Sequence, residues 1–223
     1  DVELFAVYQI NKYTVTFDSA EGTAANPVTQ NYGTSVVLPT VTREGYTFAG
    51  WYLDGKLVET LTVPAKAITL VAHWDVNSYK ITYDSDGGTA VESLTQNYGT
   101  AVELPTVTKE GHTFLGWYLD GQKVTSLTVP AEDITLVAQW SVNSYTLLFE
   151  ANGGNDVSSI KDSYGKEIVI PNASREGHTF AGWIYDGKTY KSGDKYVITA
   201  DENVEFVAQW TINQYSITFD EMG

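Results

Sequence analysis

Three histidines are the side chains of this chain that ionise nearest to neutral pH, so they are the first candidates for acid–base chemistry or metal binding. The chain contains an internal repeat, and each histidine aligns with a residue of another type in a second copy. His112 and His178 stand where an earlier copy has Tyr46, and His73 aligns with Gln139 and Gln209. Tyrosine and glutamine cannot replace imidazole in either role. We therefore expect a structural or surface role for all three histidines.

Carboxylates are numerous, but they recur in every copy at only two positions. These are Glu44, Glu110 and Glu176, and Asp54, Asp120 and Asp186, each followed by a glycine. An acidic residue before glycine is typical of a turn. A glycosidase needs two carboxylates that face each other across the scissile bond, and three such active sites in succession would be unusual. We interpret the recurring carboxylates as turn residues.

One acidic turn could be compared with a calcium-binding loop. The segment Asp84–Gly88 reads Asp-Ser-Asp-Gly-Gly, but the glutamate that completes an EF-hand loop is missing. In the other copies we align Asp86 with Glu21 and Asn152, and a hairpin turn explains the segment better. The chain has no cysteine, which excludes disulfides and thiolate sites. We expect no catalytic, cofactor-binding or metal-ligating residue, and therefore no enzyme.

Aromatic side chains are the remaining candidates, with 6 Trp and 15 Tyr in the chain. Neighbours in a strand point to opposite faces, so only one of Trp51 and Tyr52 can belong to a core. We assign as core anchors Phe48, Trp51, Trp74, Phe114, Trp117, Trp140, Phe180, Trp183 and Trp210. The candidate ligand contacts, which could stack on a sugar or a protein, are Tyr52, Tyr118 and Tyr185. The alternative is that these tyrosines only cover an open part of a sheet.

Strands that would position these residues follow from alternating apolar and polar residues. In the first copy this pattern predicts a strand over 13–17, a second over 28–38 that is interrupted at Tyr32-Gly33, and a last strand over 68–74. Pro39 should end the second strand because proline cannot donate to a ladder. The segment 39–45 is predicted to form one turn of helix or a 3₁₀ connector before the strand that carries Phe48 and Trp51.

The internal repeat sets the domain organisation. Trp51, Trp117 and Trp183 are 66 residues apart, and the third copy is four residues longer than the others between its two tryptophans. The predicted boundaries are 1–12 for the last strand of a preceding repeat, 13–78, 79–144 and 145–214 for repeats 1 to 3, and 215–223 for the first strand of a following repeat. Short connectors around Asn77, Asn143 and Asn213 lack Gly and Pro, which indicates a semi-rigid string of small domains.

Each copy also carries a family likeness. It consists of a Tyr-led first strand, a Gly-rich turn, Tyr-Gly, Pro, the motif Glu-Gly-(Tyr/His)-Thr-Phe-x-Gly-Trp and a closing (Leu/Phe)-Val-Ala-x-Trp. This pattern resembles the Listeria–Bacteroides repeat, the B-repeat of internalin-type bacterial surface proteins. The resemblance implies a strand-dominated α+β class, with tandem β-grasp (ubiquitin-like) modules in an elongated array. It implies no catalytic residues.

Composition limits the possible partners. The formal net charge of −15 repels nucleic acid and anionic lipid. No apolar run is long enough to cross a membrane, so we expect any signal peptide or anchor to lie outside this segment. An extracellular β protein without disulfides is more typical of Gram-positive bacterial surfaces than of animal secretions.

Together these observations favour a structural stalk or spacer in an adhesin-like protein of the bacterial cell surface, which projects a distal functional domain. The alternative is a multivalent module that contacts host protein or glycan through repeated exposed aromatics, with avidity from repetition. The expected partners are neighbouring repeats of the same protein, and in the alternative a host surface protein or glycan. We expect no nucleic-acid partner and no membrane insertion within this segment.

Overall fold

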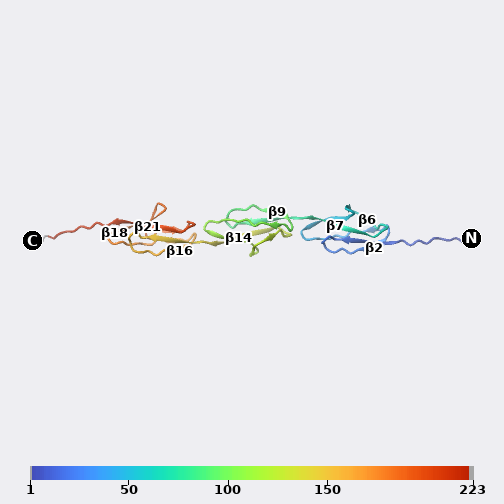
Figure 1. The fold of residues 1–223 in the computed structure, drawn as a ribbon, viewed down its shortest axis with the longest axis horizontal. Coiled ribbons are helices and arrows are strands. Elements are labelled where there is room, and N and C mark those ends of the chain that lie inside the picture. Colours follow the sequence, from blue (N-terminus) through green and yellow to red (C-terminus); the bar gives the residue numbers. More distant parts are fainter. Residues whose placement is uncertain (1, 221–223) are drawn as a thin grey trace. The chain divides into compact units, whose positions relative to one another are not determined.

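The fold is known from a computed structural model that describes residues 2–220 (Figure 1). Within these residues it contains strands, turns and irregular segments but no helix. None of the described residues therefore forms a helix that could cross a membrane.

Each repeat uses seven strands in the same order. Repeat 1 contains β1 (Lys12–Asp18), β2 (Val28–Asn31), β3 (Ser35–Val36), β4 (Tyr46–Leu53), β5 (Lys56–Val58), β6 (Leu61–Thr62) and β7 (Ile68–Val76). Repeat 2 contains β8 (Ser78–Asp84), β9 (Leu94–Asn97), β10 (Ala101–Val102), β11 (His112–Leu119), β12 (Gln122–Val124), β13 (Leu127–Thr128) and β14 (Ile134–Val142). Repeat 3 contains β15 (Ser144–Glu150), β16 (Ile160–Ser163), β17 (Glu167–Val169), β18 (His178–Tyr185), β19 (Lys188–Tyr190), β20 (Lys195–Val197) and β21 (Val204–Ile212).

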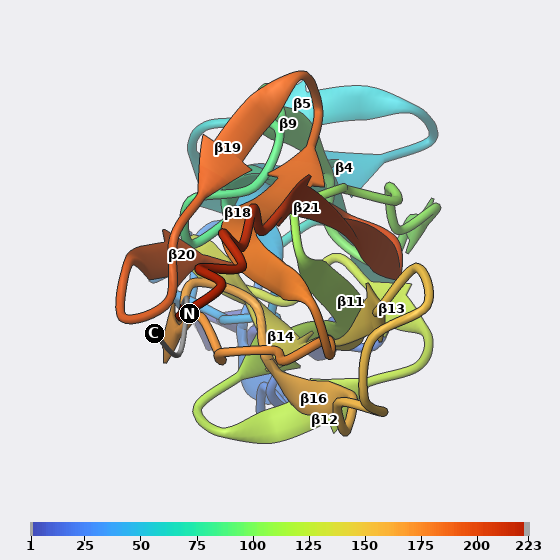
Figure 2. The ribbon, with the colours of Figure 1, turned by 90° about the vertical axis from the view of Figure 1, so that its left-hand side faces the viewer.

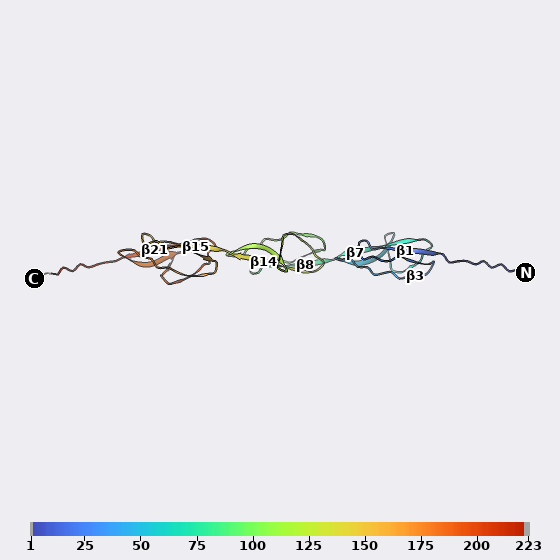
Figure 3. The ribbon, with the colours of Figure 1, turned by 90° about the horizontal axis from the view of Figure 1, so that it is seen from below.

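A five-stranded sheet and a two-stranded sheet make up each repeat. The five-stranded orders are β2-β1-β7-β4-β5, β12-β11-β14-β8-β9 and β16-β15-β21-β18-β19, and the two-stranded pairs are β3-β6, β10-β13 and β17-β20. The first and last strands of a repeat are parallel neighbours, with Val15 opposite Ile68 in repeat 1 and Leu147 opposite Val204 in repeat 3 (β15 and β21 in Figure 3). The last strand also pairs antiparallel with the Phe/Trp strand, as β18 does with β21 (Figure 2).

The predicted α+β class with β-grasp modules is wrong, because the described chain is all-β. The segment expected to form a helical turn, 39–45, contains no helix: residues 39–42 are irregular, Arg43 forms an isolated β-bridge with Tyr46, and residues 44–45 form a turn. Two of its carbonyls accept hydrogen bonds from donors that are distant in sequence, not from amides of a helical turn. Trp51 Nε1 donates to the Pro39 carbonyl at 2.8 Å, and the Thr23 amide donates to the Thr42 carbonyl at 2.8 Å. Pro39 also biases the preceding residue toward extended backbone. The segment thus covers the sheet without forming helix.

In repeats 1 and 3 the core lies on one face of the five-stranded sheet. In repeat 1, Val15 and Leu70 from the central strands are completely buried beside Trp51. In repeat 3, Leu147, Phe206 and Trp183 take the corresponding places. The alternation predicted for the first and last strands is therefore realised as buried and exposed faces.

A β-bulge in the Phe/Trp strand brings two aromatic rings to the same face. Phe48 and Trp51 are three residues apart, so a regular strand would point them to opposite faces. The register shifts between Phe48 and Gly50, and Gly50 has a φ of +129°. The extra residue rotates the strand locally, and the two rings meet edge to face with their centroids 5.6 Å apart.

The chain divides into two compact units, and the division passes through repeat 2. The first unit contains Asp1–Tyr83, Glu92–Leu104 and Leu119–Leu136, and the second contains Asp84–Val91, Pro105–Tyr118 and Val137–Gly223. The connection between repeats 1 and 2 lies in the first unit, and that between repeats 2 and 3 lies in the second. Each unit is described by itself below.

The strands predicted for neighbouring repeats at the two ends are not formed in the described residues. Residues 2–11 precede β1 without a strand, and residues 213–220 follow β21 without one. Asp1 and residues 221–223, which complete the two predicted segments, lie outside the described part of the chain.

Candidate functional site

The histidines occupy three separate places. The His73 ring stacks on Tyr52, with centroids 3.8 Å apart and planes at 12°. His112 and His178 begin β11 and β18, and each directs Nδ1 to a backbone carbonyl two residues earlier, at 2.7 Å and 2.8 Å. Residues 2–220 contain no group of three His, Asp or Glu side chains that could hold a metal ion.

The recurring carboxylates lie at turns with left-handed backbone. Asp54, Asp120 and Asp186 have φ values of +50°, +48° and +47° in the hairpins that follow the Phe/Trp strands. Glu44, Glu110 and Glu176 are exposed in front of a glycine. In the Gly-rich turn, Asp86 and Asn152 share their position with Ala20, because Gly22, Gly88 and Gly154 make the same turn hydrogen bond. Our alignment of Asp86 with Glu21 was therefore wrong by one residue.

The nine residues predicted as core anchors fall into two groups. Trp51, Trp117 and Trp183 are at most 2% exposed. Each donates its indole N–H to the carbonyl of a proline, at 2.7–2.8 Å. The three phenylalanines and the tryptophans of the last strands are only half-buried. Trp74, Trp140 and Trp210 donate instead to carbonyls of the Gly-rich turn, at 2.9–3.0 Å. Each indole thus ties a loop to the sheet, which strand periodicity alone does not indicate.

The three candidate ligand-contact tyrosines do not occupy one recurring position. Tyr52 pairs with Val71 in the ladder, and Tyr118 pairs with Val137 in the same register. Tyr185 stands one residue further on and pairs with Lys188, as Leu53 pairs with Lys56. Its ring packs on Phe206 at a centroid distance of 5.1 Å, inside the core of repeat 3. The structure therefore does not bring these tyrosines together as one repeated aromatic patch.

The connection between consecutive repeats is a single asparagine in each unit. β7 ends at Val76 and β8 begins at Ser78, which leaves only Asn77 between the two strands. β14 ends at Val142 and β15 begins at Ser144, which leaves Asn143. The connectors expected from sequence are shorter still in the structure, because residues on both sides of the asparagine belong to strands.

Hydrogen bonds hold this asparagine to both repeats. The Asn77 amide donates to the Gly45 carbonyl at 2.9 Å, and the Asn77 carbonyl accepts from the Tyr98 amide at 2.8 Å. Its side chain accepts from Thr47 Oγ1 at 2.6 Å and donates to Tyr79 Oη at 3.3 Å. In the second unit Asn143 makes the same four contacts, with Gly111, Tyr164, Thr113 and Tyr145.

A tyrosine of the later repeat lies against a glycine of the earlier one at each of these junctions. A β-carbon built on Gly45 would overlap the ring of Tyr98, and one on Gly111 would overlap the ring of Tyr164. The same rings make edge contacts with the next residue of the earlier repeat. Tyr98 lies 5.9 Å from Tyr46 and Tyr164 lies 6.1 Å from His112 between centroids. The sequence signal for this contact is the Tyr-Gly pair, predicted only to interrupt the second strand, together with the Glu-Gly pair, predicted to form a turn.

Half of the same arrangement is present at each end of the array. In repeat 3 the Asn213 amide donates to the Gly177 carbonyl at 2.9 Å, and a β-carbon on Gly177 would meet no atom within 4 Å. In repeat 1 the Tyr32 amide donates to the Asn11 carbonyl at 2.9 Å, and the Tyr32 side chain is 57% exposed.

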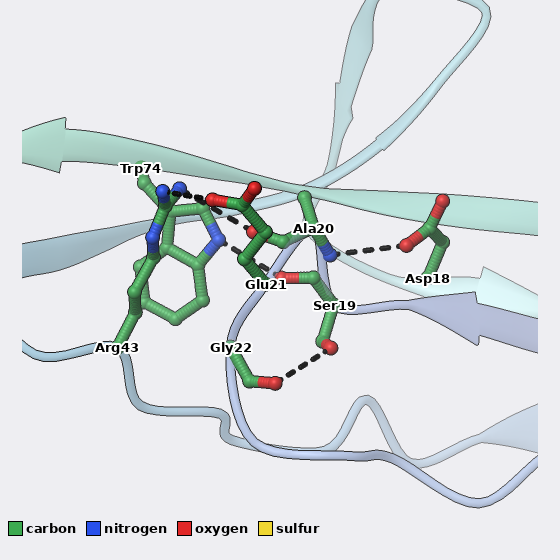
Figure 4. Close-up of polar contacts among 7 residues, drawn as sticks. All are labelled: Asp18, Ser19, Ala20, Glu21, Gly22, Arg43 and Trp74. Carbon is green, nitrogen blue, oxygen red and sulfur yellow. Dashed lines mark hydrogen bonds and ion pairs between the residues drawn. The ribbon is translucent and has the colours of Figure 1, made fainter.

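A cation next to the Gly-rich turn is a further recurring feature. In repeat 1, Arg43 forms an ion pair with Glu21 (Figure 4). Its guanidinium also lies over the ring of Tyr46, 4.0 Å from the ring centroid. Lys109 takes this position in repeat 2, with its Nζ 3.8 Å from a carboxylate oxygen of Asp86. Arg175 takes it in repeat 3 and donates to the Asn152 carbonyl at 3.2 Å.

Comparison with known families identifies the repeats. The Listeria-Bacteroides repeat domain matches residues 13–73, 79–139 and 145–209. The chain belongs to this family. The Listeria-Bacteroides repeat domain is a tandem repeat of surface proteins and not an enzyme family, in agreement with the resemblance seen in the sequence.

Relatives of this Listeria-Bacteroides repeat chain include large bacterial proteins. Two proteins of Evansella cellulosilytica, described as a membrane protein and a Gly-rich membrane protein, are 36% and 35% identical to it over 97% and 100% of the chain. Internalin H of Listeria monocytogenes is 40% identical over 59% of the chain. The chain spans only 34%, 28% and 25% of the lengths of these three relatives.

A solved structure of SHIRT domains 3–4, from a streptococcal cell surface protein, also matches. It covers 59% of this chain and 98% of its own length, with 20% identity and a TM-score of 0.22. This overlap is too low for an argument from shared geometry.

Proposed function

We propose that the chain is a stalk segment of a bacterial cell-surface protein, in which tandem repeats hold a distal functional domain away from the cell. The observation that carries this proposal is the one-residue connection between repeats, with its four hydrogen bonds and its tyrosine packed on glycine. A connection of this kind restricts rotation far more than a flexible linker of several residues does. The number of repeats then sets the distance at which the distal domain is held from the cell.

The strand order of each repeat also suits a load-bearing role. The chain enters a repeat through its first strand and leaves through its last, and these two strands are parallel neighbours. Tension on the two ends therefore pulls the strands in opposite directions along their length. Such shear loads the ladder hydrogen bonds together rather than one after another. Each repeat should resist extension more strongly than a hairpin that is pulled open from one end.

Location and partners belong to the same proposal. The similarity to internalin H and to two proteins described as membrane proteins supports an extracellular position on a cell surface, as in Gram-positive bacteria. Neighbouring repeats of the same protein are the proposed partners. The distal domain is proposed to be adhesive.

Small-angle scattering on the purified chain tests the stalk proposal. Coupled repeats should scatter as a stiff rod, with a long maximum dimension and a single narrow cross-section. A compact particle would refute the proposal.

Two insertion variants calibrate this test. Four residues, Gly-Ser-Gly-Ser, placed after Asn77 and after Asn143 should broaden the distribution of lengths, because the hydrogen-bonded connection is replaced by flexible chain. The same four residues placed after Gly55, in the β4–β5 hairpin turn, should leave the scattering curve close to that of the unmodified chain. If the junction and hairpin insertions behave alike, the junctions do not limit bending.

A further inference from the structure

The cation beside the Gly-rich turn has a different environment in repeat 3. In repeats 1 and 2 a carboxylate neutralises it, Glu21 beside Arg43 and Asp86 beside Lys109. In repeat 3, Asn152 stands where Asp86 does, and its side-chain amide donates to the Ala208 carbonyl at 3.3 Å. Among the described residues, no carboxylate lies within ion-pair distance of Arg175. The guanidinium donates to one backbone carbonyl and keeps other donors for a ligand.

A longer connection in repeat 3 adds a second cation at the same place. Two residues separate β5 from β6 in repeat 1, whereas four residues, 191–194, separate β19 from β20. This loop is fixed to the body of the repeat. The Gly193 amide donates to the Ile170 carbonyl at 2.9 Å, and the Asp194 carbonyl accepts from the Ile170 amide at 2.8 Å. The Lys191 amide donates to the Asp194 carboxylate at 2.7 Å, which holds the turn.

These changes surround a pocket of about 590 Å³. Its charged and ionisable lining residues are Arg175, His178 and Lys191, and no Asp or Glu lines it. Polar groups suited to hydroxyl ligands come from Asn172 and Ser192, and the half-buried Trp210 contributes an aromatic surface. In a chain with a formal net charge of −15, a lining that contains two cations and no carboxylate is a local reversal of charge.

The hydrogen bond that His178 makes in this pocket identifies which of its two ring nitrogens is available to a ligand. His178 Nδ1 lies 2.8 Å from the Glu176 carbonyl, which can only accept a hydrogen bond. Nδ1 therefore carries a proton, and Nε2 is the nitrogen left for a ligand. A neutral imidazole in this tautomer accepts a hydrogen bond from a hydroxyl group through Nε2.

We propose that this pocket of repeat 3 binds a sugar unit that carries a carboxylate. The Arg175 guanidinium pairs with the carboxylate in the fork geometry that arginine offers, and Lys191 adds a second positive charge. His178 Nε2, Asn172 and Ser192 accept or donate hydrogen bonds to ring hydroxyls, and Trp210 provides an apolar contact for the sugar ring. The volume is within the range of small-ligand pockets.

Repeat 2 provides a comparison within the same molecule. A pocket of about 430 Å³ beside the equivalent cation shares three positions with the pocket of repeat 3, namely Lys109, His112 and Trp140, but it is lined also by Asp86. The Asp86 carboxylate lies 3.8 Å from Lys109 Nζ and so neutralises the cation that a ligand carboxylate would pair with. We therefore expect binding in repeat 3 and not in repeat 2. This inference does not depend on the stalk proposal, because a rigid array and a single saccharide site are separate properties.

An NMR titration of the whole chain with glucuronate tests the site. The chain has three histidines, so the imidazole signal of His178 can be followed together with those of His112 and His73. The His178 signal should shift and saturate with a dissociation constant on the order of 1 mM, as expected for so small a ligand. The other two histidine signals should stay in place. Glucose and inorganic phosphate, titrated separately, should bind at least about tenfold more weakly.

Asn152→Asp is the decisive variant. It introduces the carboxylate that repeat 2 already has, and aspartate tolerates the backbone here because Asp86 has a φ of +47° where Asn152 has +48°. Glucuronate should then bind at least about tenfold more weakly. Lys191→Gln should weaken binding while leaving the loop hydrogen bonds, which use backbone atoms, in place.

Three outcomes would overturn the proposal. If glucose binds as well as glucuronate, the cations do not select the ligand. If inorganic phosphate shifts His178 at the same concentration as glucuronate, the pocket holds anions without recognising a sugar. If Asn152→Asp leaves the affinity unchanged, Arg175 does not contact the ligand.

Discussion

Tyr98 lies directly against Gly45, so that a β-carbon on Gly45 would overlap its ring. The two residues belong to successive repeats, and Asn77 links them further. The Asn77 carbonyl accepts a hydrogen bond from the Tyr98 amide, and the Asn77 amide donates one to the Gly45 carbonyl. The same relationship links Tyr164 to Gly111. Glycine is favoured at this position for two reasons. A β-carbon would overlap the Tyr98 ring, and Gly45 has a φ of +76°, which glycine adopts more readily than other residues. A contact between repeats thus depends on the absence of a side chain.

Gly45→Ala should loosen the junction between repeats 1 and 2. The substitution strains a positive φ, at a cost of about 1 kcal/mol, and drives a methyl group into the Tyr98 ring, at a further cost of about 1–3 kcal/mol. The expected result is faster hydrogen exchange of the Asn77 and Tyr98 amides and a less rod-like scattering curve.

Gly177→Ala is the matched control for that substitution. Gly177 holds the same place in repeat 3 and has a φ of +69°, but a β-carbon there would meet no atom within 4 Å. It should therefore lose only the backbone contribution, about 1 kcal/mol. Equal effects of the two substitutions on stability would show that the Tyr98 contact contributes nothing.

The direction of pulling should decide how strongly repeat 1 resists force. The chain has no cysteine, so two introduced cysteines give unique attachment points. Tension through the ends of the chain shears β1 against β7, whereas tension through Thr47→Cys and Asp75→Cys acts on residues opposite each other in the antiparallel β4–β7 ladder. Single-molecule unfolding should require clearly less force in the second geometry, because that ladder opens one hydrogen bond at a time. Equal forces would contradict the shear argument.

Trp51→Phe should destabilise repeat 1 more than Trp74→Phe does. Trp51 is 2% exposed and its indole donates to the Pro39 carbonyl, so phenylalanine leaves a cavity and an unpaired carbonyl. We expect a loss of about 2–4 kcal/mol. Trp74 is half-buried, and water can replace its bond to the Ser19 carbonyl, so about 1 kcal/mol is expected. Hydrogen exchange of β1 and β7 measures both, since several repeats need not unfold as one two-state unit.

Repeat 3 should lose stability in alkali before repeat 1 does. Burial, and then the neighbouring Tyr185, raises the pKa of Tyr196 from 10.0 to about 12. A raised pKa means that the folded state favours the neutral phenol. The stability that the folded state gains from the neutral Tyr196 phenol is therefore complete below pH 10, and it declines as the pH rises through about 12. Because Tyr196 is 8% exposed, its full ionisation corresponds to on the order of 2–3 kcal/mol.

Tyr196→Phe identifies the responsible group. Repeat 1 has Leu61 at the corresponding place in its small sheet, so it lacks this ionisation. The variant should remove most of the alkaline loss from repeat 3, as measured by urea unfolding at pH 9 and pH 11. If repeats 1 and 3 lose stability in parallel in the unmodified chain, the Tyr196 phenol is not the cause.

Alternation along single strands was enough to predict most of the sheet. The burial of Val15 and Leu70 follows from period-2 patterns that the sequence displays directly. Tyr185 does not share the position of Tyr52 and Tyr118, because repeat 3 places its tyrosine one residue later and one residue of register moves a side chain to the other face. The sequence already shows this offset, because Tyr185 lies two residues after Trp183 whereas Tyr52 lies one residue after Trp51.

What the sequence determined by itself is the set of local and periodic properties: the family, the strands and the turn residues. Only the tertiary structure decided which distant donors bind the backbone carbonyls and which side chains pack against the glycines. Residues 39–45 form no helix, because Trp51 and Thr23, distant in sequence, donate to the carbonyls of Pro39 and Thr42. The Tyr98 contact on Gly45 and the hydrogen bond from Arg175 to the Asn152 carbonyl likewise depend on residues that meet only after folding. Periodicity reports which face of an element is buried, whereas these contacts depend on which atoms arrive from elsewhere in the chain.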